Sequence, residues 1–224
     1  KHALKDINIV IPKGQFVGLI GHTGSGKSTL IQHMNGLVKA TSGTVYFNGQ
    51  DIYDKDFSLK ELRSKVGLVF QYPEHQLFET TVFEDVCFGP KNLGLPKEEV
   101  EARAKKALQM VGLKEKYYKQ SPFELSGGQK QRISIARAVA KKCPILVMDD
   151  STSALDMETE HEIQKTLEQM NDITKIIIAH RISAVRHADE IIYLQNGKIA
   201  ERGTHEELLK QKGLYYDTYV VQYG

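Results

Sequence analysis

The sequence predicts an α/β fold with a mostly parallel central sheet and a mainly helical insert. Three observations lead to this prediction. Short, β-branched apolar runs alternate along the 224-residue chain with segments of helical periodicity. The apolar runs are continuous, which is typical of parallel strands covered by helices on both faces. The stretch 71–123 interrupts the alternation, because several prolines surround a single helical pattern there.

The expected strands are the apolar runs 7–11, 16–20, 45–47, 66–70, 145–148, 176–179 and 191–194. The expected helices are 27–37, 97–111, 129–141, 158–171 and 206–211. Helical spacing in the third of them places Ile133, Ala136, Arg137 and Ala140 near one face. We expect one domain in three parts: a first core part at 1–70, the insert at 71–128 and a second core part at 129–224.

The composition excludes several classes of function. The chain is 41% hydrophobic and 26% charged, and its formal net charge of +2 gives no electrostatic reason to bind nucleic acid. No apolar run approaches the roughly 18 residues of a membrane-spanning helix, and we expect no signal peptide. Cys87 and Cys143 are too few for a disulfide framework, which favours a reducing compartment.

A phosphate-binding loop follows the expected strand 16–20. Residues 21–28, GHTGSGKS, fit the pattern G-x-x-x-x-G-K-[ST] between a strand and a helix, which is the context that confirms the motif. Lys27 is expected to reach the β- and γ-phosphates, and Ser28 to ligate Mg²⁺. The alternative is a glycine-rich turn with a chance lysine. The expected nucleotide-binding residues of this loop are Gly21, His22, Thr23, Gly24, Ser25, Gly26, Lys27, Ser28 and Thr29.

A second candidate anion site precedes the expected helix 129–141. Ser126, Gly127, Gly128 and Gln129 stand at a helix start, where backbone N–H groups and the helix dipole favour a phosphate. One nucleotide site with two phosphate-binding loops is explained by a dimer, in which each of these loops covers the nucleotide held by the other subunit. The alternative is an ordinary capped helix.

Several polar residues follow the expected strands directly. Gln71 ends the strand 66–70, Asp149 and Asp150 follow the strand 145–148, and His180 follows the strand 176–179. Ligands of open α/β sheets bind beyond the carboxyl ends of the strands, so we expect these four residues to converge with Lys27.

Five motifs in order, GHTGSGKS, Gln71, LSGGQ, ILVMDD and His180, resemble the nucleotide-binding domain of ATP-binding cassette (ABC) transporters. The resemblance implies a P-loop NTPase fold of ABC type, with ATP and Mg²⁺ as cofactors. It also implies an ATP-sandwich dimer with a second nucleotide-binding domain, driving a transmembrane subunit from the cytoplasmic face of the membrane. It implies no nucleic-acid partner.

The resemblance also assigns roles to single residues. Ser28, Gln71 and Asp149 resemble the residues that hold or contact Mg²⁺, and Ser126 to Gln129 resemble the loop that caps the opposing ATP. Asp156 resembles the aspartate at the dimer seam. The catalytic residues implied are Asp150, His180 and Gln71, with His180 contacting the γ-phosphate.

Asp150 departs from the family, which usually has a glutamate that polarises the attacking water at this position. Aspartate is one methylene shorter, and about 1 Å of misplacement can cost on the order of 10²-fold in rate. We therefore expect ATP binding with slow hydrolysis. Two alternatives stay open: a backbone adjustment that lets Asp150 serve normally, and an ATP-gated dimerisation module with little or no hydrolysis.

The two halves of the chain resemble different branches of the family. The segments QYPEHQLFETTVFEDVCFGPKNLG and SPFELSGGQKQR resemble energy-coupling-factor importer ATPases, whereas DDSTSALD and IIIAHRISAVRHADEI resemble exporters. We interpret this as a chimera joined near 126–140, with a natural intermediate as the alternative. We expect the family's adenine-stacking aromatic residue to be missing, with His2 as the candidate replacement. A soluble ABC ATPase acting on nucleic acid or ribosomes would carry paired cassettes or long coiled-coil insertions, which this sequence lacks.

Overall fold

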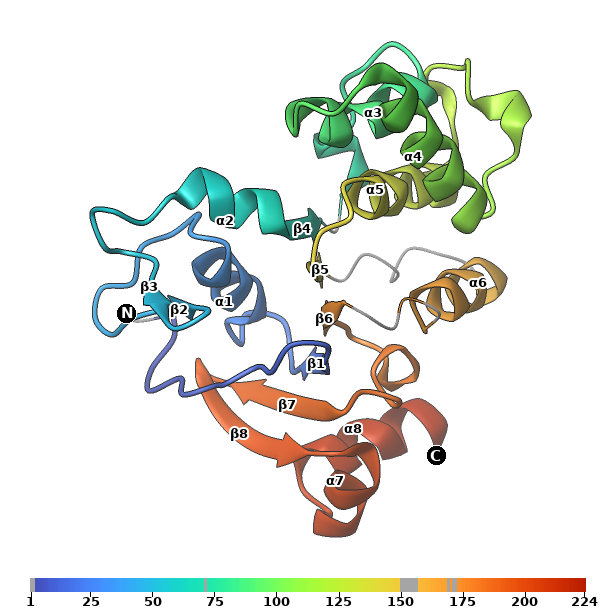
Figure 1. Ribbon diagram of the computed structural model, residues 1–224. Coiled ribbons are helices and arrows are strands. Elements are labelled where there is room, and N and C mark those ends of the chain that lie inside the picture. Colours follow the sequence, from blue (N-terminus) through green and yellow to red (C-terminus); the bar gives the residue numbers. More distant parts are fainter. Residues whose placement is uncertain (1–2, 71, 150–156, 169, 171–172) are drawn as a thin grey trace. The chain divides into compact units, whose positions relative to one another are not determined.

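A computed structural model describes residues 3–70, 72–149, 157–168, 170 and 173–224 (Figure 1). The chain divides into two compact units, residues 1–66 with 174–224, and residues 67–173. The three-part division expected from the sequence, 1–70, 71–128 and 129–224, has different boundaries and stays a prediction.

The first unit is built on a mainly parallel sheet. Strand β1 (Phe16–Ile20) pairs in parallel with β6 (Thr174–Ile178) on one side and with β7 (Glu190–Gln195) on the other. Strand β8 (Lys198–Gly203) adds an antiparallel edge to β7. The continuous apolar runs are buried on both faces, as expected for parallel strands. The other elements of this unit are α1 (Lys27–Met34), β2 (Tyr46–Phe47), β3 (Gln50–Asp51), α2 (Leu59–Lys65), the 3₁₀ turn η4 (Ile182–Ala184), α7 (His205–Gln211) and α8 (Leu214–Tyr223).

The second unit contains the helical insert. Its strands β4 (Val66–Val69) and β5 (Ile145–Asp149) are neighbours. Helices α3 (Val82–Asn92), α4 (Lys97–Met110) and α5 (Gly127–Ala140) pack together, and α6 (Met157–Glu168) follows β5 in the chain (Figure 1). The short 3₁₀ turns are η1 (Pro73–His75), η2 (Glu115–Tyr117) and η3 (Pro122–Glu124). The predicted α/β class with a mainly helical insert is confirmed.

The expected strand 7–11 is wrong. These residues, all within the described part of the chain, form no strand. Ile7, Ile9 and Ile11 are half-buried, whereas Asn8 and Val10 are exposed, Val10 to 77%. The period-2 burial indicated by the sequence is therefore present, but the segment lacks the ladder of backbone hydrogen bonds that defines a strand.

Three helices were missed, and two of them begin with a recognisable signal. The side chain of Ser58 accepts from Glu61 N at the start of α2, and the side chain of Thr81 accepts from Glu84 N at the start of α3. Both match the capping pattern S/T-x-x-E. Helix α3 was hidden by Pro90 within its last turns. The third missed helix, α8, has no side-chain cap at its N-terminus, and the missed strand β8 is an edge strand without a continuous apolar run.

No helix among the described residues combines the length and the hydrophobicity that crossing a membrane requires.

Candidate nucleotide site

The phosphate-binding loop lies between β1 and α1, as predicted. It depends on glycine at two places. Gly21 has φ +144°, and a Cβ there would lie 2.2 Å from the carbonyl oxygen of Leu194. Gly26 is the N-cap of α1 with φ +106°, and a Cβ there would lie 2.7 Å from the side chain of Leu4. Larger residues cannot adopt this loop without moving backbone, because both the dihedral angle and the space are restricted.

Lys27 holds its charge inside the loop. Only 6% of the residue is exposed, and its Nζ donates hydrogen bonds to the carbonyl oxygens of Gly21 (2.7 Å) and His22 (3.0 Å). The ammonium group thus lies against the loop backbone. Four residues of the same loop are exposed: His22, Thr23, Gly24 and Ser28. Such a loop, with a lysine and a helix N-terminus, provides a cradle for phosphates.

His180 emerges next to this loop in the same unit. The parallel register pairs Leu19 of β1 with Ile178 of β6, and Ala179 N donates to Leu19 O at 3.1 Å. Strands β1 and β6 therefore end at the same edge of the sheet. Residue 21 follows β1 there, and His180, which is exposed, follows β6. This is the placement that the strand-end rule predicts for Lys27 and His180.

The second candidate anion loop is a well-formed helix start in the other unit. Ser126 Oγ accepts from Gln129 N at 3.4 Å, and Gln129 Oε1 accepts from Ser126 N at 2.9 Å, which completes a capping box. Ser126 and Gly127 are exposed, and a Cβ on Gly127 would meet nothing within 4 Å. The geometry of an ordinary capped helix is present, and the binding of a phosphate there stays a prediction.

Asp149 ends β5 and is half-buried, as expected for a strand-end carboxylate. Three other predicted site residues, Gln71, Asp150 and Asp156, lie outside the described residues, as does His2. The predicted convergence of Lys27, Gln71, Asp149, Asp150 and His180 therefore stays a prediction. No group of three or more His, Cys, Asp and Glu side chains that could hold a metal occurs within the described ranges.

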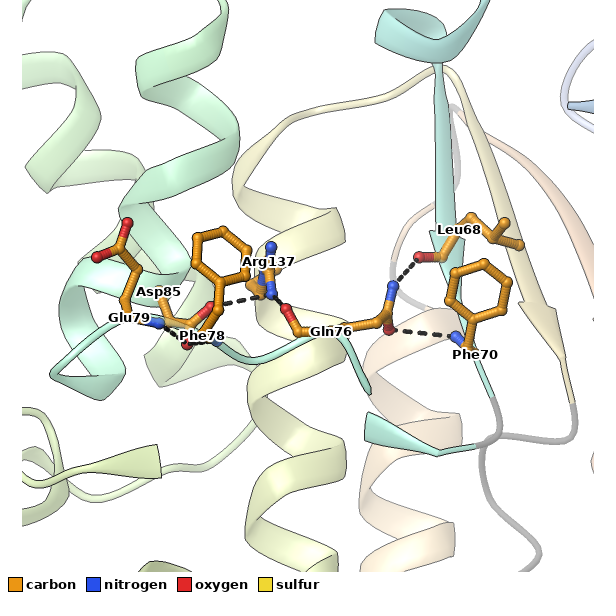
Figure 2. A network of polar contacts seen from close by, with 7 residues as sticks. All are labelled: Leu68, Phe70, Gln76, Phe78, Glu79, Asp85 and Arg137. Atoms are coloured by element: carbon orange, nitrogen blue, oxygen red, sulfur yellow. Dashed lines mark hydrogen bonds and ion pairs between the residues drawn. The ribbon is translucent and has the colours of Figure 1, made fainter. Parts of the chain in front are cut away.

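A polar network missed by sequence reasoning lies directly after residue 71. Figure 2 shows the side chain of Gln76 bonded to the end of β4: its Nε2 donates to Leu68 O (3.0 Å) and its Oε1 accepts from Phe70 N (3.2 Å). Arg137 of α5 donates to the carbonyl oxygen of Gln76. Helix α5 is thus hydrogen-bonded to Gln76, which lies in the segment that follows residue 71.

The network is completed by a buried carboxylate. Asp85 has no exposed surface; its Oδ1 lies 2.9 Å from Arg137 Nη1, and its Oδ2 accepts from the N–H groups of Phe78 and Glu79, each at 3.1 Å (Figure 2). The guanidinium also lies over the ring of Phe78 at 5.0 Å. Burial raises the pKa of the Asp85 carboxyl, an effect that the charge of Arg137 opposes.

One signal could have revealed this network. The helical spacing of α5 places Arg137 among Ile133, Ala136 and Ala140, and these three apolar residues are all buried in the structure. An arginine on an apolar helix face requires a partner. Asp85, an acidic residue flanked by the apolar residues of 82–88, is a candidate partner that the sequence offers.

Comparisons with known proteins agree with this architecture. A family model described as ABC transporter matches residues 4–153. The energy-coupling factor transporter ATP-binding protein EcfA2 of Caldanaerobacter subterraneus subsp. tengcongensis is 50% identical over 213 residues, which cover 93% of this chain and 74% of that protein.

Two solved structures are also similar. A bacterial Atm1-family ABC exporter with ATP bound has a TM-score of 0.87 and 32% identity, and the match covers 100% of this chain and 40% of the exporter chain. A dimeric ATP-binding cassette in a post-hydrolysis state, bound to ADP and phosphate, has a TM-score of 0.83 and 36% identity, covering 91% of this chain and 90% of that chain. The match to EcfA2 covers both sides of the joint expected near 126–140, so the hypothesis of a chimera gains no support from it.

Proposed function

The chain belongs to the ABC transporter family, and we propose that it serves as the ATP-binding subunit of an energy-coupling-factor transporter. As a member of the family it is an ATPase that binds ATP, dimerises around it with a second nucleotide-binding domain and powers a membrane transporter through transmembrane components. The finer assignment is supported by the 50% identity to EcfA2. It implies a location on the cytoplasmic face of the membrane.

The observation that carries the nucleotide chemistry is the position of Lys27. Its ammonium group is bonded to the loop backbone at Gly21 and His22, at the N-terminus of α1. In the proposed mechanism it binds the β- and γ-phosphates, while the loop N–H groups surround them. His180, which leaves the sheet beside the loop, contacts the γ-phosphate. Because these residues bind and orient the phosphates, Lys27→Ala abolishes nucleotide binding in an equilibrium titration with a fluorescent ATP analogue.

The oxygen donors predicted from the sequence suit Mg²⁺. Ser28 is exposed and Asp149 is half-buried. Their side chains offer hydroxyl and carboxylate oxygens, which are the hard ligands that this ion prefers. We propose that Ser28, Gln71 and Asp149 hold the ion, which when bound neutralises phosphate charge.

We also propose that Asp150 makes hydrolysis slow, because its carboxylate reaches one methylene less far toward the attacking water than a glutamate. Asp150→Glu then raises the turnover number by about tenfold or more, since placement errors of about 1 Å cost on the order of 10²-fold. The measurement is steady-state phosphate release at saturating Mg-ATP, with equal ATP affinity of both forms as the control. Equal turnover of the two forms contradicts the assignment.

Asp150 also favours a second function, that of an ATP-gated dimerisation module. Size-exclusion chromatography with and without Mg-ATP, in parallel with phosphate release, separates the two functions. A dimer that forms with Mg-ATP and releases no phosphate over hours supports the module, whereas dimers that form and turn over support the ATPase motor.

A further inference from the structure

We propose that Gln222 is a positioning residue for His180, fixing the backbone on both sides of Arg181. The amide of Gln222 makes two hydrogen bonds to this segment: Nε2 donates to His180 O at 2.7 Å, and Oε1 accepts from Ile182 N at 2.9 Å. A backbone carbonyl only accepts and a backbone N–H only donates, so the two contacts fix the orientation of the amide. The proposal rests on the role given to His180 in the proposed function.

The segment that Gln222 holds joins a strand to a 3₁₀ turn. A backbone hydrogen bond from Ala179 N to Leu19 O joins the end of the strand to the sheet, directly before His180. The turn η4 begins at Ile182, and its N-cap, Arg181, supplies no side-chain cap. The first N–H groups of a helical turn have no partner within the turn, so Gln222 Oε1 satisfies one that the local sequence leaves open. The same side chain anchors the carbonyl of the histidine.

Helix α8, which carries Gln222, is itself attached to the sheet. At its start, Glu201 of β8 accepts hydrogen bonds from Leu214 N (2.5 Å) and Tyr215 N (3.0 Å). One turn later, Thr218 Oγ1 lies 3.2 Å from the hydroxyl of Tyr193 on β7.

The ring of Tyr215 adds a third attachment. It is fully buried, and its hydroxyl lies 2.7 Å from His205 Nδ1 of α7. Gln222 therefore extends from a helix with a defined position, and its amide imposes that position on residues 180–182. A positioning side chain requires a rigid support of this kind.

The same arrangement occurs a second time in the chain. Gln76 bonds the carbonyl of Leu68 and the N–H of Phe70, which are two residues apart, as Gln222 bonds His180 and Ile182. Each glutamine thus spans an i, i+2 pair of backbone groups at the end of a strand. Each pair adjoins or includes a residue that the family resemblance makes catalytic, Gln71 and His180. The recurrence favours a role in positioning over a chance surface contact.

Removal of the amide is expected to lower kcat more than it changes KM for ATP. Substrate affinity depends on the loop around Lys27, whereas the described hydrogen bonds of the Gln222 amide go to His180 and Ile182. The placement of His180 determines how well the γ-phosphate is engaged. Because displacements of about 1 Å cost on the order of 10²-fold, a partial displacement predicts a loss of about tenfold in kcat.

The test compares Gln222→Leu, which keeps the size and removes both hydrogen bonds, with Val221→Ala as the matched control. Val221 is the neighbour of Gln222 on α8 and is 87% exposed. In steady-state ATPase assays of the full chain, Gln222→Leu is expected to lose about tenfold in kcat with KM within about twofold, and Val221→Ala to match the unmodified chain. Equal changes in the two variants, or a loss confined to KM, overturn the proposal.

A double-mutant cycle with His180→Ala separates this inference from the proposed function. If Gln222 acts through His180, Gln222→Leu lowers kcat no further when His180 is already alanine. Losses that multiply in the double mutant overturn the inference. If His180→Ala alone has unchanged kcat, the role of His180 in the proposed function is wrong.

Should Gln222→Leu fail to fold, Gln222→Glu provides a second variant. Its carboxylate still accepts from Ile182 N but faces the carbonyl oxygen of His180 with a second oxygen. The expected result is a lower kcat with unchanged KM, and a kcat equal to that of the unmodified chain overturns the proposal.

Discussion

The buried pair of Asp85 and Arg137 allows a quantitative prediction about stability. In Arg137→Met, the side chain keeps most of its length, but it loses its charge, its hydrogen-bonding groups and the guanidinium that lies over the rings of Phe78 and Phe88. The carboxylate of Asp85, which has no exposed surface, then lies in the interior without its counter-charge. The carbonyl of Gln76 also loses the guanidinium that donates to it.

The magnitude follows from the burial of the carboxylate. Removing one partner of a buried ion pair costs about 3–5 kcal/mol, because the remaining charge is left uncompensated. A typical domain is stable by only about 5–15 kcal/mol. With a denaturant slope of about 2 kcal/mol per molar urea, a loss of about 4 kcal/mol moves the unfolding midpoint down by about 2 M.

The assay is urea unfolding followed by circular dichroism, with Arg103→Met as the matched control. The side chain of Arg103 is about as buried as that of Arg137, but its partner Glu99, one turn away on α4, is 45% exposed, whereas Asp85 has no exposed surface. The carboxylate left by Arg103→Met therefore stays in contact with water, and the expected change in stability is about 1 kcal/mol or less. A double variant, Arg137→Met with Asp85→Asn, is expected to be more stable than Arg137→Met alone, because the buried charge is gone while Asn can still accept from Phe78 N. A midpoint for Arg137→Met within the range of the Arg103 control refutes the reasoning.

The loss of unfolding free energy in Arg137→Met also depends on pH. Burial raises the pKa of Asp85 above its ordinary value of 3.8, and Arg137 opposes this rise, so the variant has a still higher pKa. A carboxyl that binds protons more tightly when folded loses stability as pH rises through its folded pKa and regains it as pH falls toward its unfolded pKa. The midpoints of variant and unmodified chain are therefore expected to converge below the folded pKa of the variant.

Two further predictions concern the first unit. Gly21→Ala is expected to lose more than about 3 kcal/mol in unfolding free energy, because its Cβ would lie 2.2 Å from Leu194 O. Gly24→Ala, with open space around the Cβ and φ +79°, is expected to lose about 1–2 kcal/mol. Equal losses of the two variants in urea titrations would contradict this. Burial lowers the pKa of His205 below 6.5 in the folded protein. Thermal stability is therefore expected to fall as pH drops through about 6.5 toward this lower pKa, and His205→Asn is expected to lack this fall. Identical pH profiles of the two proteins would count against the prediction.

The parts of the fold that could be predicted from sequence are those that depend on local patterns. Phe16–Ile20 and the phosphate-binding loop were predicted because a buried parallel strand and a glycine-rich turn have local sequence signatures. The segment 7–11 has the periodicity of a strand, but pairing depends on a neighbour that periodicity does not identify. The caps at Ser58 and Thr81 carry a signal that would have identified α2 and α3.

The candidate site shows the same limit. Lys27, Ser126 and His180 could be identified from motifs and strand ends, and the structure places them at such positions. Gln76 and Gln222 could not, because a glutamine bonded to backbone groups has no pattern of its own. Its role depends on which segment lies opposite, and that is a property of the tertiary structure.

The capping box of Ser126 has a consequence for the speed and strength of association. The groups that shape this exposed loop belong to residues 126 and 129, three positions apart, so the loop takes its conformation from its own sequence and needs no second subunit to do so. Ordering a flexible backbone costs about 1–2 kcal/mol per residue, and a loop that is already ordered avoids most of that entropy loss on docking. The surface predicted to meet the opposing nucleotide is in this sense preorganised, which favours productive encounters between two subunits.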